Sequence, residues 1–316
     1  MVEAGSGDIA KAARLLRAGR LVAFPTETVY GLGADASSAE AIARLYAVKG
    51  RPEDHPVIVH VADAVTAFKW ASEVPEAARK LAEEFWPGPL TLILNRMPHV
   101  GDFVTGGQDT VGLRVPGHPL AHELLKEFGG GLAAPSANRF GRVSPTTAQH
   151  VREDLEDDVD LILDGGPCGV GIESTIVDLS RGKPVLLRPG GISKAQLESV
   201  LGESVATPDA GAPRVSGSLA AHYAPRTPAR LVSAGELDSE IARLGKSAAL
   251  LAFGVPDERV DFWLRMPRDP AQYAQKLYAA LRELDSSGAK VLLIESPPDT
   301  PDWLGVLDRL RRAARD

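Results

Sequence analysis

Cysteine is almost missing from this chain, because Cys168 is the single one among 316 residues. An internal disulfide is therefore impossible, and a disulfide-stapled scaffold is excluded. No apolar run approaches the roughly 20 residues that span a bilayer, and the first residues lack the cationic and apolar stretches of a signal peptide. Basic residues are outnumbered, 35 against 42 acidic ones, for a formal net charge of −7. Because long polyanions select basic surfaces, we expect a cytoplasmic protein without stable nucleic-acid or membrane binding.

Several catalytic signatures are missing as well. No HExxH metalloprotease motif occurs, and one cysteine cannot build a thiolate zinc site. Neither a GxSxG nucleophile elbow nor the protein-kinase signature set is present. The glycine-rich stretch 169–175 is not a P-loop, since no Gly-Lys-Ser/Thr follows it. It is not a Rossmann fingerprint either, since a strand rather than a helix follows it.

The composition that remains is globular, with 44% hydrophobic and 24% charged residues, and the length suffices for two domains. Helical and strand periodicities alternate over the first part of the chain. They predict a many-stranded α/β domain in which parallel and antiparallel pairs are both possible. Proline and glycine then interrupt every regular pattern, which indicates a linker. We expect a first domain at 1–206, a linker at 207–229 and a smaller α/β domain at 230–316.

Cations gather in the loops of this acidic chain. The basic side chains at strand ends and in Gly/Pro-rich loops are Lys49, Arg51, His55, His60, Arg114, His118, Arg139, Arg142 and Arg188. Functional loops meet at one edge of an α/β sheet, so these groups together could line a pocket for a compact polyanion such as a triphosphate. For any one arginine a solvated surface charge is the simpler interpretation. The coincidence of the whole group with turns favours a site.

Two of these cations lie within predicted strands. Along 57–61 the alternation puts valines on one face and His60 on the other, and along 111–115 it isolates Arg114 in the same way. A buried cation is costly unless an anion meets it. His60 is either a hydrogen-bonded neutral core histidine or a ligand contact. Arg114 either forms an internal ion pair or receives a substrate carboxylate in bidentate fashion.

Three further segments supply polar donors, although each signal is weak alone. KGRP at 49–52 brackets a glycine with two cations, and the glycine would let a ligand approach closely. The hydroxyl-rich stretch 25–33 leaves a buried strand and is interpreted as a turn with polar donors. The stretch 134–146 places small hydroxyl and amide groups ahead of a helix, whose N-terminal N–H groups could meet an anion.

Nine short blocks of sequence, each different, follow one another along the chain. They are PTETVYGLG (25–33), KGRP (49–52), VHV (59–61), WPGPLT (86–91), RVP (114–116), PSAN (135–138), ESTIVD (173–178), LRPG (187–190) and HYAP (222–225). Together they resemble the threonylcarbamoyl-AMP synthase family over nearly all of 8–200 and into the linker. The additional C-terminal unit is similar to the long, two-domain form of that family.

The resemblance implies a YrdC-type catalytic domain, a twisted mixed α/β sheet with a concave, electropositive cavity, beside the small C-terminal α/β domain. It implies a nucleotidyltransferase that condenses L-threonine, bicarbonate and ATP into threonylcarbamoyl-AMP and pyrophosphate. The product would serve the threonylcarbamoyladenosine modification of tRNA, with a separate transferase complex as the downstream partner. Mg²⁺ would be carried by the ATP phosphates rather than by protein side chains, since no carboxylate cage is visible.

The resemblance also implies roles for individual residues. Thr28, His60, Arg114 and Ser174 would hold L-threonine, with Arg114 on its carboxylate. Lys49 and Arg51 would be the catalytic pair that neutralises the ATP phosphates. The nucleotide site would be completed by Thr110, Ala134, Ser136, Asn138, Ser144, Arg188 and Tyr223. Tyr223, in the linker, would close over the nucleotide as a lid, and the closed lid would protect a hydrolysable carbamate from water.

Two places depart from the family. The family often has Asn and Leu around the proline after KGRP, where this chain has His55-Pro56-Val57, and it commonly has serine before Gly141, where this chain has Phe140. Either a nucleotide-side donor is absent or an adenine contact is apolar there. Two other functions stay open from the sequence. An RNA-binding or regulatory module could keep the fold without catalysis, although the net charge of −7 weighs against it. A carbamoyl transferase using carbamoyl phosphate would not require threonine.

Overall fold

The chain forms two compact units in a computed structural model that describes residues 6–217, 222–254 and 258–315. Unit 1 comprises Met1–Phe140, Pro145–Gly169 and Glu173–Ser218. Unit 2 comprises Gly141–Ser144, Val170–Ile172 and Leu219–Asp316. The expected boundaries at 206 and 229 stay predictions. Among the described residues, no helix is both long enough and apolar enough to cross a membrane.

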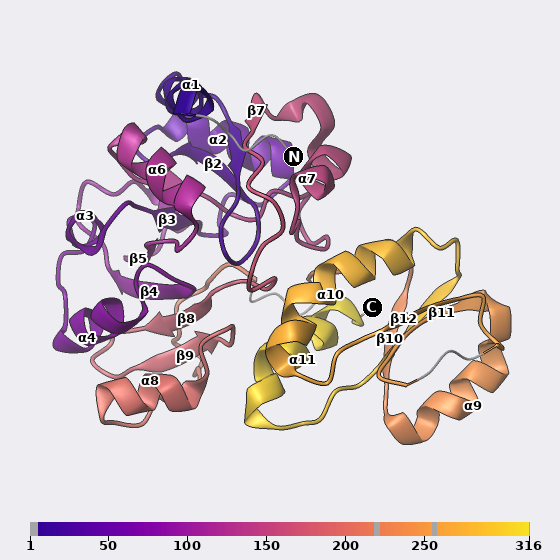
Figure 1. The fold of residues 1–316 in the computed structure, drawn as a ribbon. Helices are drawn as coiled ribbons and strands as arrows, with labels where there is room; N and C mark the ends of the chain where they lie inside the picture. The colour runs from indigo at the N-terminus through magenta and orange to yellow at the C-terminus, as the bar shows by residue number, and fades with distance from the viewer. Residues whose placement is uncertain (1–5, 218–221, 255–257, 316) are drawn as a thin grey trace. The chain divides into compact units, whose positions relative to one another are not determined.

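Unit 1 is built on a nine-stranded sheet in the order β7-β1-β2-β6-β3-β5-β4-β8-β9 (Figure 1). Its strands are β1 (Val22–Phe24), β2 (Gly31–Asp35), β3 (Ile58–His60), β4 (Leu90–Asn95), β5 (Thr110–Arg114), β6 (Leu132–Ala133), β7 (Leu161–Ile162), β8 (Thr175–Asp178) and β9 (Val185–Arg188). Its helices are α1 (Ser6–Arg17), α2 (Ala39–Lys49), α3 (Ala64–Phe68), α4 (Glu76–Phe85), α5 (Asp102–Thr105), α6 (Pro119–Phe128), α7 (Ala148–Leu155), the 3-10 helix η1 (Glu156–Asp158) and α8 (Lys194–Leu201). Parallel and antiparallel pairs both occur, so the mixed α/β sheet is confirmed.

The two faces of this sheet are covered differently. One face packs on α2, α4 and α8 through a large apolar cluster that includes Leu92 and Leu113. At its β1–β2–β6 end, the opposite face packs on α1 and α6 through Phe24 and Leu132. Leu132 is paired in register with His60 of β3, so its side chain and that of His60 lie on the same face. Beyond the apolar end, this second face therefore carries polar side chains.

Strand β2 forms where the sequence suggested part of a turn, and this correction has a packing reason. A Cβ at Gly33 would lie 2.9 Å from the Phe24 ring and 3.1 Å from the carbonyl oxygen of Val22. The glycine therefore lets the Phe24 ring cross the antiparallel β1–β2 pair. The hydroxyl-rich turn is correspondingly shorter than predicted and ends before Gly31.

Helix α2 ends where the site begins. Ser38 caps its N-terminus by accepting a hydrogen bond from the Ala41 amide, and Gly50 caps its C-terminus in the left-handed conformation with φ 62°. The cap at Gly50 turns the chain out of the helix directly between Lys49 and Arg51. A side chain at this φ would be strained, so the glycine of KGRP serves the backbone.

Unit 2 holds a four-stranded parallel sheet in the order β10-β13-β11-β12. Its elements are β10 (Ala229–Val232), α9 (Ala234–Leu244), η2 (Gly245–Ser247), β11 (Ala248–Ala252), β12 (Phe262–Arg265), α10 (Pro270–Asp285), β13 (Val291–Glu295), η3 (Pro301–Trp303) and α11 (Leu304–Ala313). The small α/β domain expected from the sequence is thereby confirmed. Gly171, at φ +80°, packs so closely on α10 that a Cβ would lie 2.4 Å from the Cα of Gln275. Close packing within unit 2 therefore explains this glycine of the 169–175 stretch.

Candidate active site

Three neighbouring strands bring polar side chains together on the second face of the unit 1 sheet. His60 of β3 is paired in register with Arg114 of β5, and Leu113 pairs with Leu92 of β4, which places Thr91 beside Arg114. All three polar side chains are buried. The Phe24 ring meets the His60 ring edge-on, with 6.4 Å between the ring centroids. The alternation in the sequence therefore placed His60 and Arg114 on one face correctly.

Arg114 is held by three acceptors from two segments. Its Nη1 donates to the Thr28 hydroxyl at 2.9 Å and its Nε to the Gly88 carbonyl at 3.3 Å. Its Nη2 forms an ion pair with Glu27 Oε1 at 2.7 Å. Of the two interpretations left open by the sequence, the internal ion pair is present, and the carboxylate that makes it follows Thr26 in the PTET block. Whether Arg114 also receives a substrate carboxylate stays a prediction.

His60 is a neutral imidazole. Burial, and then the neighbouring charge of Arg114, lower its pKa from 6.5 to about 3. Its Nδ1 lies 3.2 Å from the carbonyl oxygen of Ile58. A carbonyl can only accept, so Nδ1 carries the proton and Nε2 carries a lone pair. The ring therefore offers a hydrogen-bond acceptor rather than a charge.

Ser174, at the start of β8, joins the group through two partners. Its hydroxyl lies 2.7 Å from the Thr91 hydroxyl. Arg188 of β9 wraps around it, because Nη2 donates to the Ser174 carbonyl at 2.9 Å and to its hydroxyl at 3.1 Å, while Nε donates to the same carbonyl at 3.1 Å. The four residues predicted to bind L-threonine thus occur in one connected region of unit 1. They are Thr28, His60, Arg114 and Ser174.

Arg51 and Arg188, which are far apart in the sequence, converge on a single residue. Arg51 Nη2 donates to the Ser216 hydroxyl at 3.1 Å, and Arg188 Nη1 donates to the Ser216 carbonyl at 2.7 Å. The preceding Val215 is buried against Ile58 and other isoleucines of the same sheet face. The start of the expected linker therefore lies on the cationic site within unit 1.

Lys49 is buried and its Nζ donates to the backbone carbonyls of Ser136 and Asn138. Burial, followed by the nearby charge of Arg51, holds the pKa of Lys49 well below its usual range. Both acceptors belong to the PSAN block, so KGRP and PSAN meet in unit 1. A group whose charge is disfavoured by its surroundings is a ready partner for an incoming anion.

Phe140, a position that departs from the family, packs on Arg51 and His55. The Arg51 guanidinium lies 5.5 Å from the centroid of its ring, and the His55 ring meets it edge-on with 5.4 Å between centroids. A cation stacked on an aromatic face is stabilised and oriented. In this structure Phe140 therefore supports Arg51.

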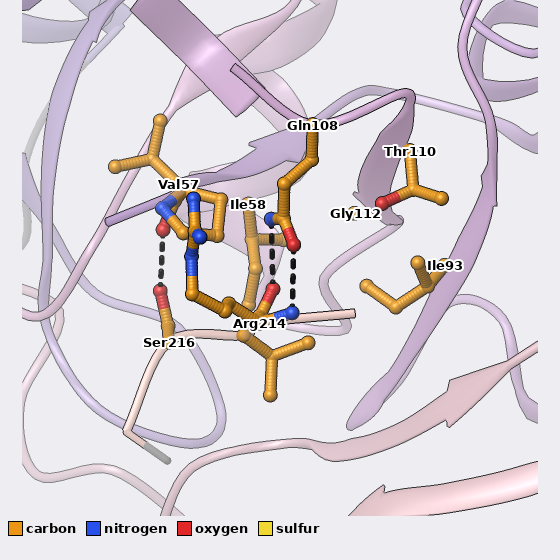
Figure 2. A pocket seen from close by; sticks show the side chains of 10 residues that line it. Val57, Ile58, Ile93, Gln108, Thr110, Gly112, Arg214 and Ser216 are labelled. Atoms are coloured by element: carbon orange, nitrogen blue, oxygen red, sulfur yellow. Dashed lines mark hydrogen bonds between the residues drawn. The ribbon is translucent and has the colours of Figure 1, made fainter. Parts of the chain in front are cut away.

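A small, partly open pocket of about 10 Å³ lies on the apolar half of the same face (Figure 2). Its lining comprises Pro56, Val57, Ile58, Ile93, Gln108, Thr110, Gly112, Arg214, Val215 and Ser216. Gln108 and the backbone of Arg214 exchange two hydrogen bonds, of 2.7 and 3.0 Å, which Figure 2 shows as a matched pair. A Cβ at Gly112 would lie 3.2 Å from Ile93 Cδ1, so the glycine keeps this space open.

The remaining predicted nucleotide residues are distributed between the units. In unit 1 the Ala134 amide donates to the Ile58 carbonyl at 3.1 Å, and the Asn138 side chain donates to the Arg139 carbonyl at 2.8 Å. Ser144 and Tyr223 belong to unit 2, where both are buried. Tyr223 has a φ of 60°. Its action as a lid stays a prediction.

Sequence reasoning missed four groups of the site. Glu27, Gly88, Thr91 and Ser216 all contact predicted site residues. A signal existed for Thr91, since a hydroxyl interrupts the apolar run 90–94. A carboxylate beside Thr28 was likewise the nearest candidate to balance Arg114. Gly88 and Ser216 act through backbone or tertiary contacts, for which no local pattern exists.

Among the described residues, no group of three or more His, Cys, Asp or Glu side chains could hold a metal ion. The donor set of this face, guanidinium, ammonium and hydroxyl groups, suits anions rather than cations. The described side chains of this face thus provide no cage for Mg²⁺.

The sequence and the fold of this chain are similar to those of known proteins. A family model described as "Telomere recombination" matches residues 14–190, and one described as "Threonylcarbamoyl-AMP synthase, C-terminal domain" matches residues 192–315. The threonylcarbamoyl-AMP synthase of Pyrococcus abyssi is 40% identical over 96% of this chain and 93% of its own. That of Bacillus subtilis is 41% identical over 97% and 92%. The crystal structure of P. abyssi Sua5 complexed with L-threonine superposes with a TM-score of 0.92 at 38% identity, covering 98% of this chain and 95% of that one.

Two α/β domains with a buried cationic face thus define an ATP-using nucleotidyltransferase. The chain belongs to the threonylcarbamoyl-AMP synthase family. The family, enzyme class and fold expected from the sequence motifs are confirmed. The full-length agreement favours the synthase over the RNA-binding module and the carbamoyl transferase.

Proposed function

We propose that the polar face of unit 1 binds L-threonine and ATP side by side and joins them through a carbamate made from bicarbonate. The observation that supports this most directly is the convergence of Lys49, Arg51, Arg114 and Arg188 as buried cations of one unit. Guanidinium and ammonium groups gathered in this way suit a carboxylate and a triphosphate as ligands. The crystal structure of the P. abyssi relative is described as complexed with L-threonine, which agrees with an amino-acid site.

The threonine subsite would lie between β3, β5 and the start of β8. Arg114 would take the carboxylate through N–H groups left by its three protein acceptors, as a bidentate pair. His60, as a neutral acceptor, would receive a hydrogen bond from the amine or the hydroxyl of the substrate. A cationic imidazole would repel an ammonium group, so the lowered pKa of His60 suits a substrate amine.

The nucleotide would lie beside this subsite. Lys49 and Arg51 would hold the phosphates together with Arg188, and an arriving triphosphate would supply the anion that restores the charge of the buried Lys49. Thr110, which borders the small pocket of this face, would contact the nucleotide. Ser136 and Asn138 would complete the nucleotide contacts within unit 1. Mg²⁺, when bound, would neutralise charge on the phosphates.

The chemistry needs positioning and charge stabilisation rather than a covalent enzyme intermediate. Bicarbonate takes up a proton and loses water to give CO₂. The unprotonated amine adds to this CO₂ and releases one proton, which gives a carbamate, so that the net reaction of amine and bicarbonate releases one water. A carbamate oxygen then attacks the α-phosphorus, and the bond from the α-phosphorus to the bridging oxygen breaks as pyrophosphate leaves. Lys49 and Arg51 would stabilise the charge that develops on the leaving group.

The product would pass to a separate transferase complex that modifies tRNA, and the cytoplasmic location expected from the sequence stays a prediction. The decisive experiment supplies threonine, ATP, Mg²⁺ and ¹³C-bicarbonate, and follows pyrophosphate together with the mass of the adenylate. We expect one labelled carbon in each threonylcarbamoyl-AMP and one pyrophosphate for each adenylate. Pyrophosphate release that does not need threonine, or an adenylate without label, would refute the proposal. Replacing bicarbonate with carbamoyl phosphate tests the carbamoyl transferase alternative.

A further inference from the structure

The Glu27 carboxylate bridges two elements around the cation of the threonine subsite. Its Oε1 accepts from Arg114 Nη2 at 2.7 Å, and its Oε2 accepts from the backbone amide of Gly117 at 2.9 Å. Arg114 is the last residue of β5, and Gly117 lies in the turn that leads to α6. The two oxygens therefore have different partners, and the carboxylate cannot rotate without losing one of them.

We infer that Glu27 is a positioning residue, which fixes the guanidinium of Arg114 so that it can receive the carboxylate of L-threonine. This inference rests on the proposed role of Arg114. A guanidinium has five N–H groups in one plane, and three of them point at Gly88, Thr28 and Glu27. These three acceptors, two of them on neighbouring residues, define that plane. One N–H on each Nη atom is then directed for a bidentate ligand.

Charge supports the same role. Only 5% of the Arg114 side chain and 18% of the Glu27 side chain are exposed, so the cation is neutralised inside the protein before substrate arrives. Without this partner, the buried guanidinium would move to bind other acceptors or water. Glu27 therefore keeps Arg114 in place in the empty site, and threonine binding does not have to pay for its rearrangement.

The same contact has a rival interpretation, which predicts the opposite change in threonine affinity when Glu27 is replaced. If Glu27 occupied the place of the substrate carboxylate, threonine would have to displace it, and removing its charge would tighten threonine binding. The hydrogen bond to Gly117 argues against displacement, because it ties Glu27 to the turn before α6 as well as to Arg114.

Two substitutions of Glu27 test the inference. Glu27→Gln removes the charge at nearly the same size, and Glu27→Asp keeps the charge but shortens the reach. We expect both to raise the KM for L-threonine about ten- to hundredfold, the range for one charged hydrogen bond, and to leave the KM for ATP within about twofold. Glu123→Gln, at an exposed position of α6, is the matched control and should behave as the unmodified chain. A fall in the KM for threonine, or equal effects on both substrates, would overturn the inference.

A substrate analogue separates positioning from general damage. L-threoninamide lacks the carboxylate charge, so the preference for threonine over threoninamide measures what Arg114 contributes. We expect this preference to shrink in Glu27→Gln, and an unchanged preference would contradict the role. Arg114→Ala separates a failure of the proposed threonine site from a failure of the role proposed for Glu27. If it leaves the KM for threonine unaltered, the proposed threonine site is wrong, whereas if it raises that KM and Glu27→Gln does not, only the role of Glu27 is wrong.

Should both Glu27 variants fail to fold, the unmodified chain still decides the question. A crystal structure with bound L-threonine should keep Glu27 Oε1 on Arg114 Nη2 while the substrate carboxylate takes other N–H groups. Release of Glu27 from Arg114 in that complex would show displacement and would refute positioning.

Discussion

Acidification should lower the free energy of unfolding of unit 1, because the buried His60 is held in its neutral form. The fold lowers the pKa of this imidazole from 6.5 to about 3, mainly by burial and then by the charge of Arg114. The unfolded chain therefore binds a proton below pH 6.5 that the folded chain refuses. The stability that depends on neutral His60 is fully present above pH 6.5 and declines as the pH falls toward 3. At about 1.4 kcal/mol per pH unit, the loss between pH 7 and pH 5 is about 2 kcal/mol.

Hydrogen exchange followed by mass spectrometry can measure this loss unit by unit. Peptides that cover β3 and β5 should lose about 2 kcal/mol more protection free energy between pH 7 and pH 5 in the unmodified chain than in His60→Asn, after correction for intrinsic exchange. Burial also lowers the pKa of His55 and His118, but these groups contribute in both proteins and cancel in the difference. His99→Asn, at an exposed position, is the control and should keep the full response. Equal losses in the unmodified chain and in His60→Asn would refute the reasoning.

Four further substitutions follow from the contacts. Arg114→Ala should raise the KM for threonine much more than that for ATP, and it should lower the melting temperature because it leaves a carboxylate buried without its partner; steady-state kinetics with equal effects on both substrates would mark Arg114 as structural. Lys49→Ala should slow turnover about 10²-fold, as expected for a group that stabilises the leaving phosphate, and an unchanged rate removes it from the mechanism. Ser216→Ala should lower the KM for ATP severalfold, because Arg51 loses a competing acceptor; a rise would show that Ser216 binds the nucleotide instead. Arg309→Met, in unit 2, removes a fully buried guanidinium that lies 5.3 Å from the centroid of the Tyr223 ring, so exchange at residues 222–225 should speed up, and unaltered exchange would contradict this.

Local patterns predicted the parts of the site that repeat along strands. Alternation with a period of two placed His60 and Arg114 opposite their valine neighbours, and register pairing in the structure brings them together. A buried cation also implied an anion, but the sequence did not say which one. The structure identifies this anion as Glu27, which lies in the turn between β1 and β2 and forms an ion pair with Arg114.

The parts that were missed depend on contacts between distant segments. Gly33 looked like part of a turn because the Phe24 ring that needs its missing Cβ lies on another strand. Ser216 lies in a stretch of prolines and glycines that has no period, and only the tertiary fold reveals that Arg51 and Arg188 both meet it. Gly171, within the 169–175 stretch, likewise meets the backbone of α10, a contact that no local pattern reveals.

A crystal structure of the chain with L-threonine and a non-hydrolysable ATP analogue tests the central claim most directly. The threonine carboxylate should lie within hydrogen-bond distance of Arg114, with the triphosphate against Lys49 and Arg51 on the same face of the unit 1 sheet. Threonine or the analogue bound away from that face, with these cations still paired to the protein acceptors described above, would contradict it.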